Sequence, residues 1–314
     1  MKSGPSALQS KIDNRKSAIL MKSCRNAVLA VAYLCALPLS GAAAWKAECL
    51  SVKSRILNHS VGYCALLPPS YDTAKTKKYP VLYYLHGLGD NQQMFLHAGG
   101  LNMVEDEWER GEIGEFVLVT PEGGRTFYIN SRDGRERYED FFLREFMPYI
   151  ESHYRIERGR KFRGIAGISM GGYGALHLAF RHPGLFASVS AGSAAIIEDL
   201  PNVKLQGSQQ AAVGRIFGGA FGNPVDPAFV ARESPLTLAR TLRPAGLKIY
   251  FDCGDKDDYG FERGAAALDK ILTARHIPHE YHLYPGGHNW MYFAGHIPAS
   301  LEFHSHAFGL KGGK

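Results

Sequence analysis

The chain has 314 residues, of which 45% are hydrophobic and 21% are charged, a composition typical of a globular protein with one large or two small domains. The formal net charge is +6, but residues 1–44 hold six basic residues and one acidic residue, so the remaining chain is almost neutral. Bulk charge therefore gives no support for a nucleic-acid partner or for binding to an anionic membrane.

The first 44 residues have the pattern of a targeting segment. Two basic residues follow Met21, residues 27–39 are apolar, and Ala42–Ala44 supply the small side chains typical of a cleavage site. The apolar run is too short to span a membrane, and the pattern favours a signal peptide over an N-terminal anchor or a buried helix. Either Met1 or Met21 could be the start, residues 1–20 being an upstream extension in the second case. We therefore expect a secreted or periplasmic protein with no stable membrane span after cleavage.

Three cysteines remain once the leader is removed: Cys49, Cys64 and Cys253. Export permits a disulfide, and Cys49 and Cys64 flank a predicted hairpin, so these two could pair. Spacing alone does not decide this, because disulfide formation depends on geometry. No Cys/His cluster has the spacing of a zinc site, so the sequence predicts no metal centre.

Short apolar runs and amphipathic stretches alternate behind the leader. Strands at 49–54 and 61–67 predict a hairpin. Further strands are predicted at 81–85, 116–120, 162–168, 186–194, 247–254 and 279–287, and helices at 101–111, 138–154, 169–183, 261–276 and 289–308. The alternation predicts one α/β domain over residues 45–314, with a mostly parallel sheet, an antiparallel N-terminal edge and helices on both faces. A Gly-, Pro- and Gln-rich insertion with short helical pieces interrupts it at about 194–240.

Three of the predicted strands are each followed by a candidate reactive side chain, in chain order a serine, an aspartate and a histidine. Residues 167–171, Gly-Ile-Ser-Met-Gly, fit the G-x-S-x-G nucleophile elbow, which places Ser169 on a sharp turn from a strand into a helix. Serine needs an adjacent base, and among the 13 histidines His288 is preferred because it follows the last strand at a Gly-Gly turn.

A carboxylate should orient that histidine, and the segment "DCGDKDD" offers several. Asp252 lies within the predicted strand, whereas Asp255, Asp257 and Asp258 follow it. Spacing barely separates these three. We prefer Asp257 and expect the others to be solvated or to cap the helix that begins at Phe261.

Two backbone N–H groups should form an oxyanion hole. One is expected from Met170, the residue after the nucleophile, and the other from Leu88 in the loop "HGLGD" after the strand 81–85. Gly87 lets the backbone turn inward there, and His86 is expected to brace the loop.

Several segments resemble the esterase D-like family of α/β-hydrolases, namely "LPPSYD", "YPVLYYLHGLGDN", "YEDFFLREFMPYIE", "GISMGGYGAL", "FGNPVDP", "SPLTLA", "FDCGDKDD" and "YPGGHNW". The resemblance covers about Ser51 to the closing helix and implies the α/β-hydrolase fold. It places the nucleophile on Ser169, the base on His288 and the acid on Asp257, four residues after Cys253. The family usually has an aromatic or aliphatic residue where this chain has Asp258.

The resemblance also implies a function, because the family includes S-formylglutathione hydrolases, feruloyl and acetyl xylan esterases, and mycolyltransferases. It implies a serine carboxylesterase that forms an acyl-enzyme without a cofactor and acts on small or polysaccharide-linked esters of the feruloyl or acetyl type. The leader, and Gly89-Asp90 where S-formylglutathione hydrolases carry Thr-Cys, favour such an esterase over that thioesterase. The same fold could also serve an acyltransferase with the same triad or a non-catalytic binding module. Gly87, Trp290 and the segment "FGGAFG" at 217–222 are candidates for contacts with the substrate.

Overall fold

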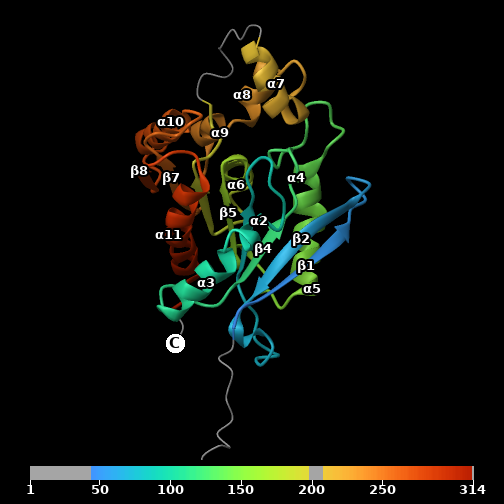
Figure 1. Cartoon of the computed structure of the whole chain (residues 1–314), viewed down its shortest axis with the longest axis vertical. Helices are drawn as coiled ribbons and strands as arrows, with labels where there is room; N and C mark the ends of the chain where they lie inside the picture. The colour runs from blue at the N-terminus through green and yellow to red at the C-terminus, as the bar shows by residue number, and fades with distance from the viewer. Residues whose placement is uncertain (1–43, 198–207, 313–314) are drawn as a thin grey trace, which may run out of the picture. The chain divides into compact units, whose positions relative to one another are not determined.

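An eight-stranded mixed sheet organises the chain in this computed structural model, which describes residues 44–197 and 208–312 (Figure 1). The strands are β1 (Lys46–Lys53), β2 (Ser60–Leu67), β3 (Val81–Leu85), β4 (Val117–Pro121), β5 (Arg163–Ile168), β6 (Ser188–Gly192), β7 (Lys248–Gly254) and β8 (Glu280–Tyr284). Their order is β1-β2-β4-β3-β5-β6-β7-β8, with β1 and β2 antiparallel to their neighbours and β3 to β8 parallel to one another. The predicted sheet and its antiparallel edge are confirmed. The predicted signal peptide and residues 198–207 of the predicted insertion lie outside the described residues.

The helices follow the predicted alternation. They are α2 (Met94–His97), α3 (Gly100–Glu109), α4 (Tyr138–Phe141), α5 (Met147–His153), α6 (Met170–Arg181), α7 (Ser208–Phe221), α8 (Pro227–Glu233), α9 (Pro235–Thr241), α10 (Phe261–Ala274) and α11 (Trp290–Phe308). A π-helical turn, η2 (Phe142–Phe146), joins α4 to α5, so the single helix predicted at 138–154 contains a wider turn. Phe141, Phe142 and Phe146 are all fully buried there.

Apolar side chains cover both faces of the sheet. In β3, Val81, Tyr83 and Leu85 join the apolar cluster that contains side chains of α6 and α10, whereas Leu82 and Tyr84 join a second cluster with side chains of α3 and α11. This alternation is the two-residue period of a strand that is buried on both sides. It explains why the sequence of β3 is a continuous apolar run.

The described part of the insertion is helical. Figure 1 shows α7 and α8 above the upper end of α6. Phe217 and Phe221 of α7 pack against Phe127, with ring centroids 5.1 and 5.2 Å apart, and Phe221 also contacts Tyr173 of α6. The insertion therefore brings aromatic rings to the end of the domain at which α6 begins.

A disulfide joins the two strands of the N-terminal edge. Cys49 and Cys64 lie directly opposite each other in the register of β1 and β2, and their sulfurs are bonded. The pairing that spacing left open therefore follows from strand register. Among the helices of the described ranges, none combines the length and apolar character that a membrane crossing requires.

Candidate active site

Ser169 occupies a strained turn between β5 and α6. Its φ of 53° and ψ of −118° lie in a region that residues other than glycine rarely adopt. A Cβ at Gly167 would lie 2.4 Å from the carbonyl carbon of Gly171, and one at Gly171 would lie 2.0 Å from the backbone oxygen of Leu85. Both glycines of the motif are therefore required for the helix to pack this closely against the sheet.

His288 connects Ser169 to Asp257. Its Nε2 lies 2.9 Å from Ser169 Oγ, and its Nδ1 lies 2.7 Å from Asp257 Oδ2. An ionised carboxylate only accepts hydrogen bonds, so Nδ1 carries a hydrogen, and Nε2 of the neutral ring is left to accept the serine hydroxyl. The rings of Tyr259 and Phe261 stand edge-on to the imidazole, with centroids 4.9 and 5.3 Å away.

Asp257 is buried and kept ionised by its partners. Burial on its own would raise the pKa of Asp257, but the hydrogen bond from His288 and the N–H groups of Tyr259 and Phe261 hold that pKa below its ordinary value. The Cys253 thiol lies 3.8 Å from Asp257 Oδ2 and donates to it. Burial raises the pKa of Cys253 to about 12, so this thiol stays protonated.

The two neighbouring aspartates hold the main chain of the histidine loop. Asp255 Oδ1 accepts the Gly286 N–H at 2.9 Å, and Asp258 Oδ2 accepts the His288 N–H at 3.0 Å. Both carboxylates are exposed, as expected, but they do not cap the next helix, because they accept N–H groups of the loop that carries His288. The Phe261 N–H at the start of α10 instead meets Asp257 Oδ1 at 3.5 Å.

The loop after β3 lies against the nucleophile. A Cβ at Gly87 would lie 3.6 Å from Ser169 Cβ, so this glycine allows the backbone to approach. Leu88 and Met170 line the same cavity as Ser169, and neither of their N–H groups donates a hydrogen bond to another residue in the described ranges. The N–H groups of both residues are thus without an internal partner among the described residues, as donors of an oxyanion hole must be.

His86 braces that loop, as expected. Its Nδ1 lies 2.8 Å from the Gly87 carbonyl and must donate to it, so its Nε2 accepts the Gly123 N–H at 2.9 Å. The Tyr128 hydroxyl donates to the His86 carbonyl at 3.1 Å. The loop with the candidate oxyanion donor is therefore fixed from two sides.

An apolar cavity of about 310 Å³ opens beside Ser169. Its walls are formed by Leu88, Phe127, Ser169, Met170, Ala195, Ile197, Ile216, Phe217, Tyr259, Phe261 and His288. No lysine or arginine is among these described residues. The cavity therefore suits an uncharged group of moderate size.

The residues predicted to contact the substrate differ in their position relative to this cavity. Phe217 of the segment "FGGAFG" lies in its wall, and Gly87 lies beside Ser169, whereas Trp290 packs against the cluster on the α3 and α11 face. Sequence reasoning missed Phe127, which lies in the wall with a left-handed φ of 53°. No local pattern signals it, because Phe217 meets it from a segment far along the chain.

One group in the described ranges could offer ligands to a metal. Atoms of Glu139, His177 and Glu233 all lie within 4.8 Å of one another. However, Arg181 Nη2 bonds Glu233 Oε2, and His182 Nε2 lies 2.7 Å from Glu139 Oε1. Both carboxylates therefore already have partners, and we treat the group as part of an ion-pair network.

Comparison with known proteins gives consistent matches. Residues 54–304 match the model of a family described as "Putative esterase". An esterase of Mycobacterium tuberculosis is 30% identical over 247 residues, which cover 72% of this chain and 52% of that protein, so the chain spans about half of its length. An acetyl esterase of Caldicellulosiruptor saccharolyticus is 26% identical over 261 residues, 80% of this chain and 95% of that protein. A solved structure of a ferulic acid esterase has a TM-score of 0.71 and 28% identity, covering 85% of this chain and 99% of that chain.

Proposed function

The chain belongs to this esterase family and has the α/β-hydrolase fold, and from that premise we propose that it is a serine carboxylesterase that works through an acyl-enzyme. One observation carries the proposal: the continuous hydrogen-bonded line from Ser169 through His288 to Asp257, at the wall of an apolar cavity. The strained φ of Ser169 supports it, because strained backbone of this kind gathers at reactive positions.

In this mechanism Ser169 Oγ attacks the ester carbonyl while His288 Nε2 takes its proton. Asp257 holds the ring and stabilises the imidazolium that forms. The N–H groups of Leu88 and Met170 bind the oxyanion of the tetrahedral intermediate, and each such donor contributes roughly 2.7–4 kcal/mol to transition-state stabilisation. His288 then protonates the leaving alcohol and activates the water that releases the acid.

The decisive test replaces the nucleophile. Ser169→Ala should remove hydrolysis of p-nitrophenyl acetate, and a fluorophosphonate probe should label the wild-type protein but not the variant. Circular dichroism provides the control for folding. A folded Ser169→Ala protein with wild-type turnover would reject the mechanism, and failure of the probe to label the wild type would favour a non-catalytic binding module.

We assign the acid role to Asp257 and positioning roles to Asp255 and Asp258. Asp257→Asn should lower kcat by roughly 10⁴, the loss seen in serine proteases when the orienting carboxylate becomes an amide. Asp255→Asn and Asp258→Asn keep an oxygen that accepts a backbone N–H, so they should lose much less. If either of them lost more activity than Asp257→Asn, the assignment would be wrong.

For the substrate we propose uncharged esters of feruloyl or acetyl type, free or linked to a plant polysaccharide. The apolar walls of the cavity support this class, and so do the relatives named acetyl esterase and ferulic acid esterase. The test is a panel of methyl ferulate, acetylated xylan and p-nitrophenyl esters of increasing chain length. Product analysis with an added alcohol acceptor separates hydrolysis from acyl transfer.

A thioesterase acting on S-formylglutathione has less support. Glutathione carries two carboxylates, and the described residues that line the cavity include no cation to pair with them. Hydrolysis of S-formylglutathione with a kcat/KM above that of all oxygen esters in the panel would reverse this preference.

We also propose that the protein is exported. The leader pattern supports this, and so does the bond between Cys49 and Cys64, because disulfides persist in oxidising compartments. Expression of the full chain followed by N-terminal sequencing of the extracellular or periplasmic protein tests it. A start within about 42–45 is expected, and an uncleaved cytosolic product would reject export.

A further inference from the structure

A second, larger cavity in the described ranges is separate from the candidate active site. It has a volume of about 800 Å³ and lies between the loop 130–134, the stretch α4–η2, the end of α6 and α8. Its residue Arg181 ends α6, whereas Ser169 precedes the first residue of that helix. Twelve helical residues span about 18 Å, so the two sites lie a helix length apart.

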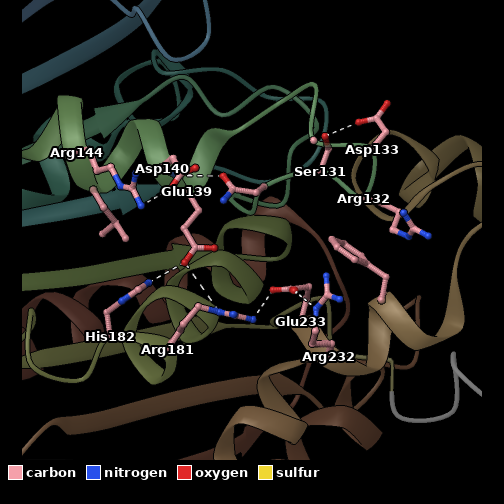
Figure 2. Close-up of a pocket in the computed structure, with 14 residues that line it drawn as sticks. Ser131, Arg132, Asp133, Glu139, Asp140, Arg144, Arg181, His182, Arg232 and Glu233 are labelled. Atoms are coloured by element: carbon pink, nitrogen blue, oxygen red, sulfur yellow. Dashed lines mark hydrogen bonds and ion pairs between the residues drawn. The ribbon is translucent and has the colours of Figure 1, made fainter.

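Four arginines from different segments reach this cavity: Arg132, Arg144, Arg181 and Arg232. Figure 2 shows Arg144 and Arg132 on opposite sides, with Arg181 and Arg232 between them. The side chains of Arg132, Arg144 and Arg232 are 51%, 69% and 65% exposed. Three guanidinium groups are therefore accessible to a ligand in the cavity.

The four carboxylates of the cavity balance these charges, but they are already engaged. Glu139 accepts hydrogen bonds from His182 and His177, and Glu233 accepts them from Arg181 and Arg232. Asp140 pairs with Arg137 and Arg144. Asp133 accepts from Ser131 and from the Arg135 N–H, and the Arg135 side chain lies beside its second oxygen. The side chains of Glu139, Glu233 and Asp140 are only 11%, 8% and 16% exposed, and Asp133 alone is mostly exposed, at 54%. Few free acceptors therefore face the cavity.

Donors, by contrast, remain free. Arg132 uses Nε for Asp226, Arg232 uses Nε for Glu233, and Arg144 uses one terminal nitrogen for Asp140. In the part of the chain that the structure describes, the other guanidinium nitrogens of these three residues have no hydrogen-bond partner, although the Arg232 group lies over the Phe229 ring, 4.7 Å from its centroid. A guanidinium carries five N–H donors whose fork geometry matches a carboxylate or phosphate. A ligand in the cavity would therefore have to supply hydrogen-bond acceptors.

We propose that this cavity binds an extended anionic ligand with several carboxylates, of the class of a short acidic oligosaccharide. The opposite placement of Arg132 and Arg144 requires anionic groups at more than one point of the ligand (Figure 2). The volume lies in the upper part of the range of about 300–1,000 Å³ found for small-molecule sites. The proposal does not depend on the esterase mechanism.

Isothermal titration calorimetry with trigalacturonate tests it, with xylotriose as the neutral sugar and inorganic phosphate as the small anion. Trigalacturonate should bind with a Kd of about 1 mM or below, and added salt should weaken it. The Arg132→Gln/Arg144→Gln double variant should bind at least tenfold more weakly. Arg240→Gln is the matched control, because Arg240 is exposed in the last turn of α9 and does not line the cavity.

Three results would overturn the proposal: no binding of trigalacturonate, equal binding of xylotriose, or equal affinity for phosphate. Unchanged affinity in the double variant would also place the ligand elsewhere. Hydrolysis of p-nitrophenyl acetate should be the same in all these variants. Loss of binding without loss of hydrolysis therefore tests the cavity alone, and a protein that binds but does not hydrolyse rejects only the proposed function.

Discussion

Asp258 offers a sharp test of how the histidine loop is positioned. The loop contains two consecutive glycines before His288, so its backbone has considerable freedom. Two carboxylates restrict it, Asp255 at the Gly286 N–H and Asp258 at the His288 N–H. Asp258→Ala removes the contact on the histidine itself and leaves both triad hydrogen bonds of the ring in place.

The expected loss follows from that one contact. A hydrogen bond to a charged group contributes about 1.5–3 kcal/mol, and the exposure of Asp258 puts this bond at the lower end. A loss of about 1.4 kcal/mol in the transition state is a tenfold loss of rate. We therefore expect kcat of Asp258→Ala to fall about tenfold, with KM nearly unchanged because Asp258 does not line the apolar cavity.

The assay is hydrolysis of p-nitrophenyl acetate, with the concentration of active sites titrated by a fluorophosphonate. Asp258→Asn should retain kcat within about threefold of the wild type, because its amide oxygen still accepts the N–H. Thermal unfolding of both variants separates positioning from general destabilisation. Equal losses in the two variants, or a wild-type kcat in Asp258→Ala, would refute the positioning role.

Three further predictions concern the turn, the core and the cavity. Gly167→Ala should destabilise the protein by about 3 kcal/mol or prevent folding, because the added methyl would lie 2.4 Å from Gly171, and wild-type stability in denaturant would contradict this. Burial raises the pKa of Asp252 to about 6, so the folded protein binds a proton there more tightly than the unfolded chain, and stability falls as the pH rises from about 4 to 6. The free energy of unfolding of Asp252→Asn should therefore exceed that of the wild type by up to about 3 kcal/mol at pH 8 and by little at pH 4. An equal difference at both pH values would reject this reasoning. Phe217→Ala should raise kcat/KM for p-nitrophenyl octanoate relative to acetate roughly tenfold, and an unchanged ratio would show that Phe217 does not limit the acyl chain.

The sheet could be predicted because its signals are local. Each buried strand is a short apolar run that ends at a turn, as in β3 and β4, and the hairpin of β1 and β2 lies next to them in sequence. The elbow could be predicted for the same reason, since Gly167 and Gly171 act within one turn of Ser169. Patterns of a few residues are sufficient where the interacting partners are close in the chain.

Phe217 of the cavity wall lies in the candidate segment 217–222, but the rest of the aromatic wall could not be predicted, because its parts meet only in the folded chain. Phe127 adopts a left-handed φ and is held by Phe217 and Phe221 of α7, about 90 residues away in sequence. Nothing in the neighbourhood of Phe127 indicates either fact. Trp290 is the opposite case, because it is close to His288 in sequence but does not line the cavity.

The ambiguity among the three aspartates has a physical origin. Sequence reasoning treats them as competitors for one role, but each contacts a different atom of the same loop: Asp255 the Gly286 N–H, Asp257 the His288 ring and Asp258 the His288 N–H. Only Asp257 is buried, so only its charge acts on the imidazole with little screening from water. The exposed Asp255 and Asp258 fix the position of the loop backbone, and their charges act little on the imidazole. A loop with two glycines needs such anchors, because a displacement of about 1 Å in a reacting group can cost roughly 10²-fold in rate.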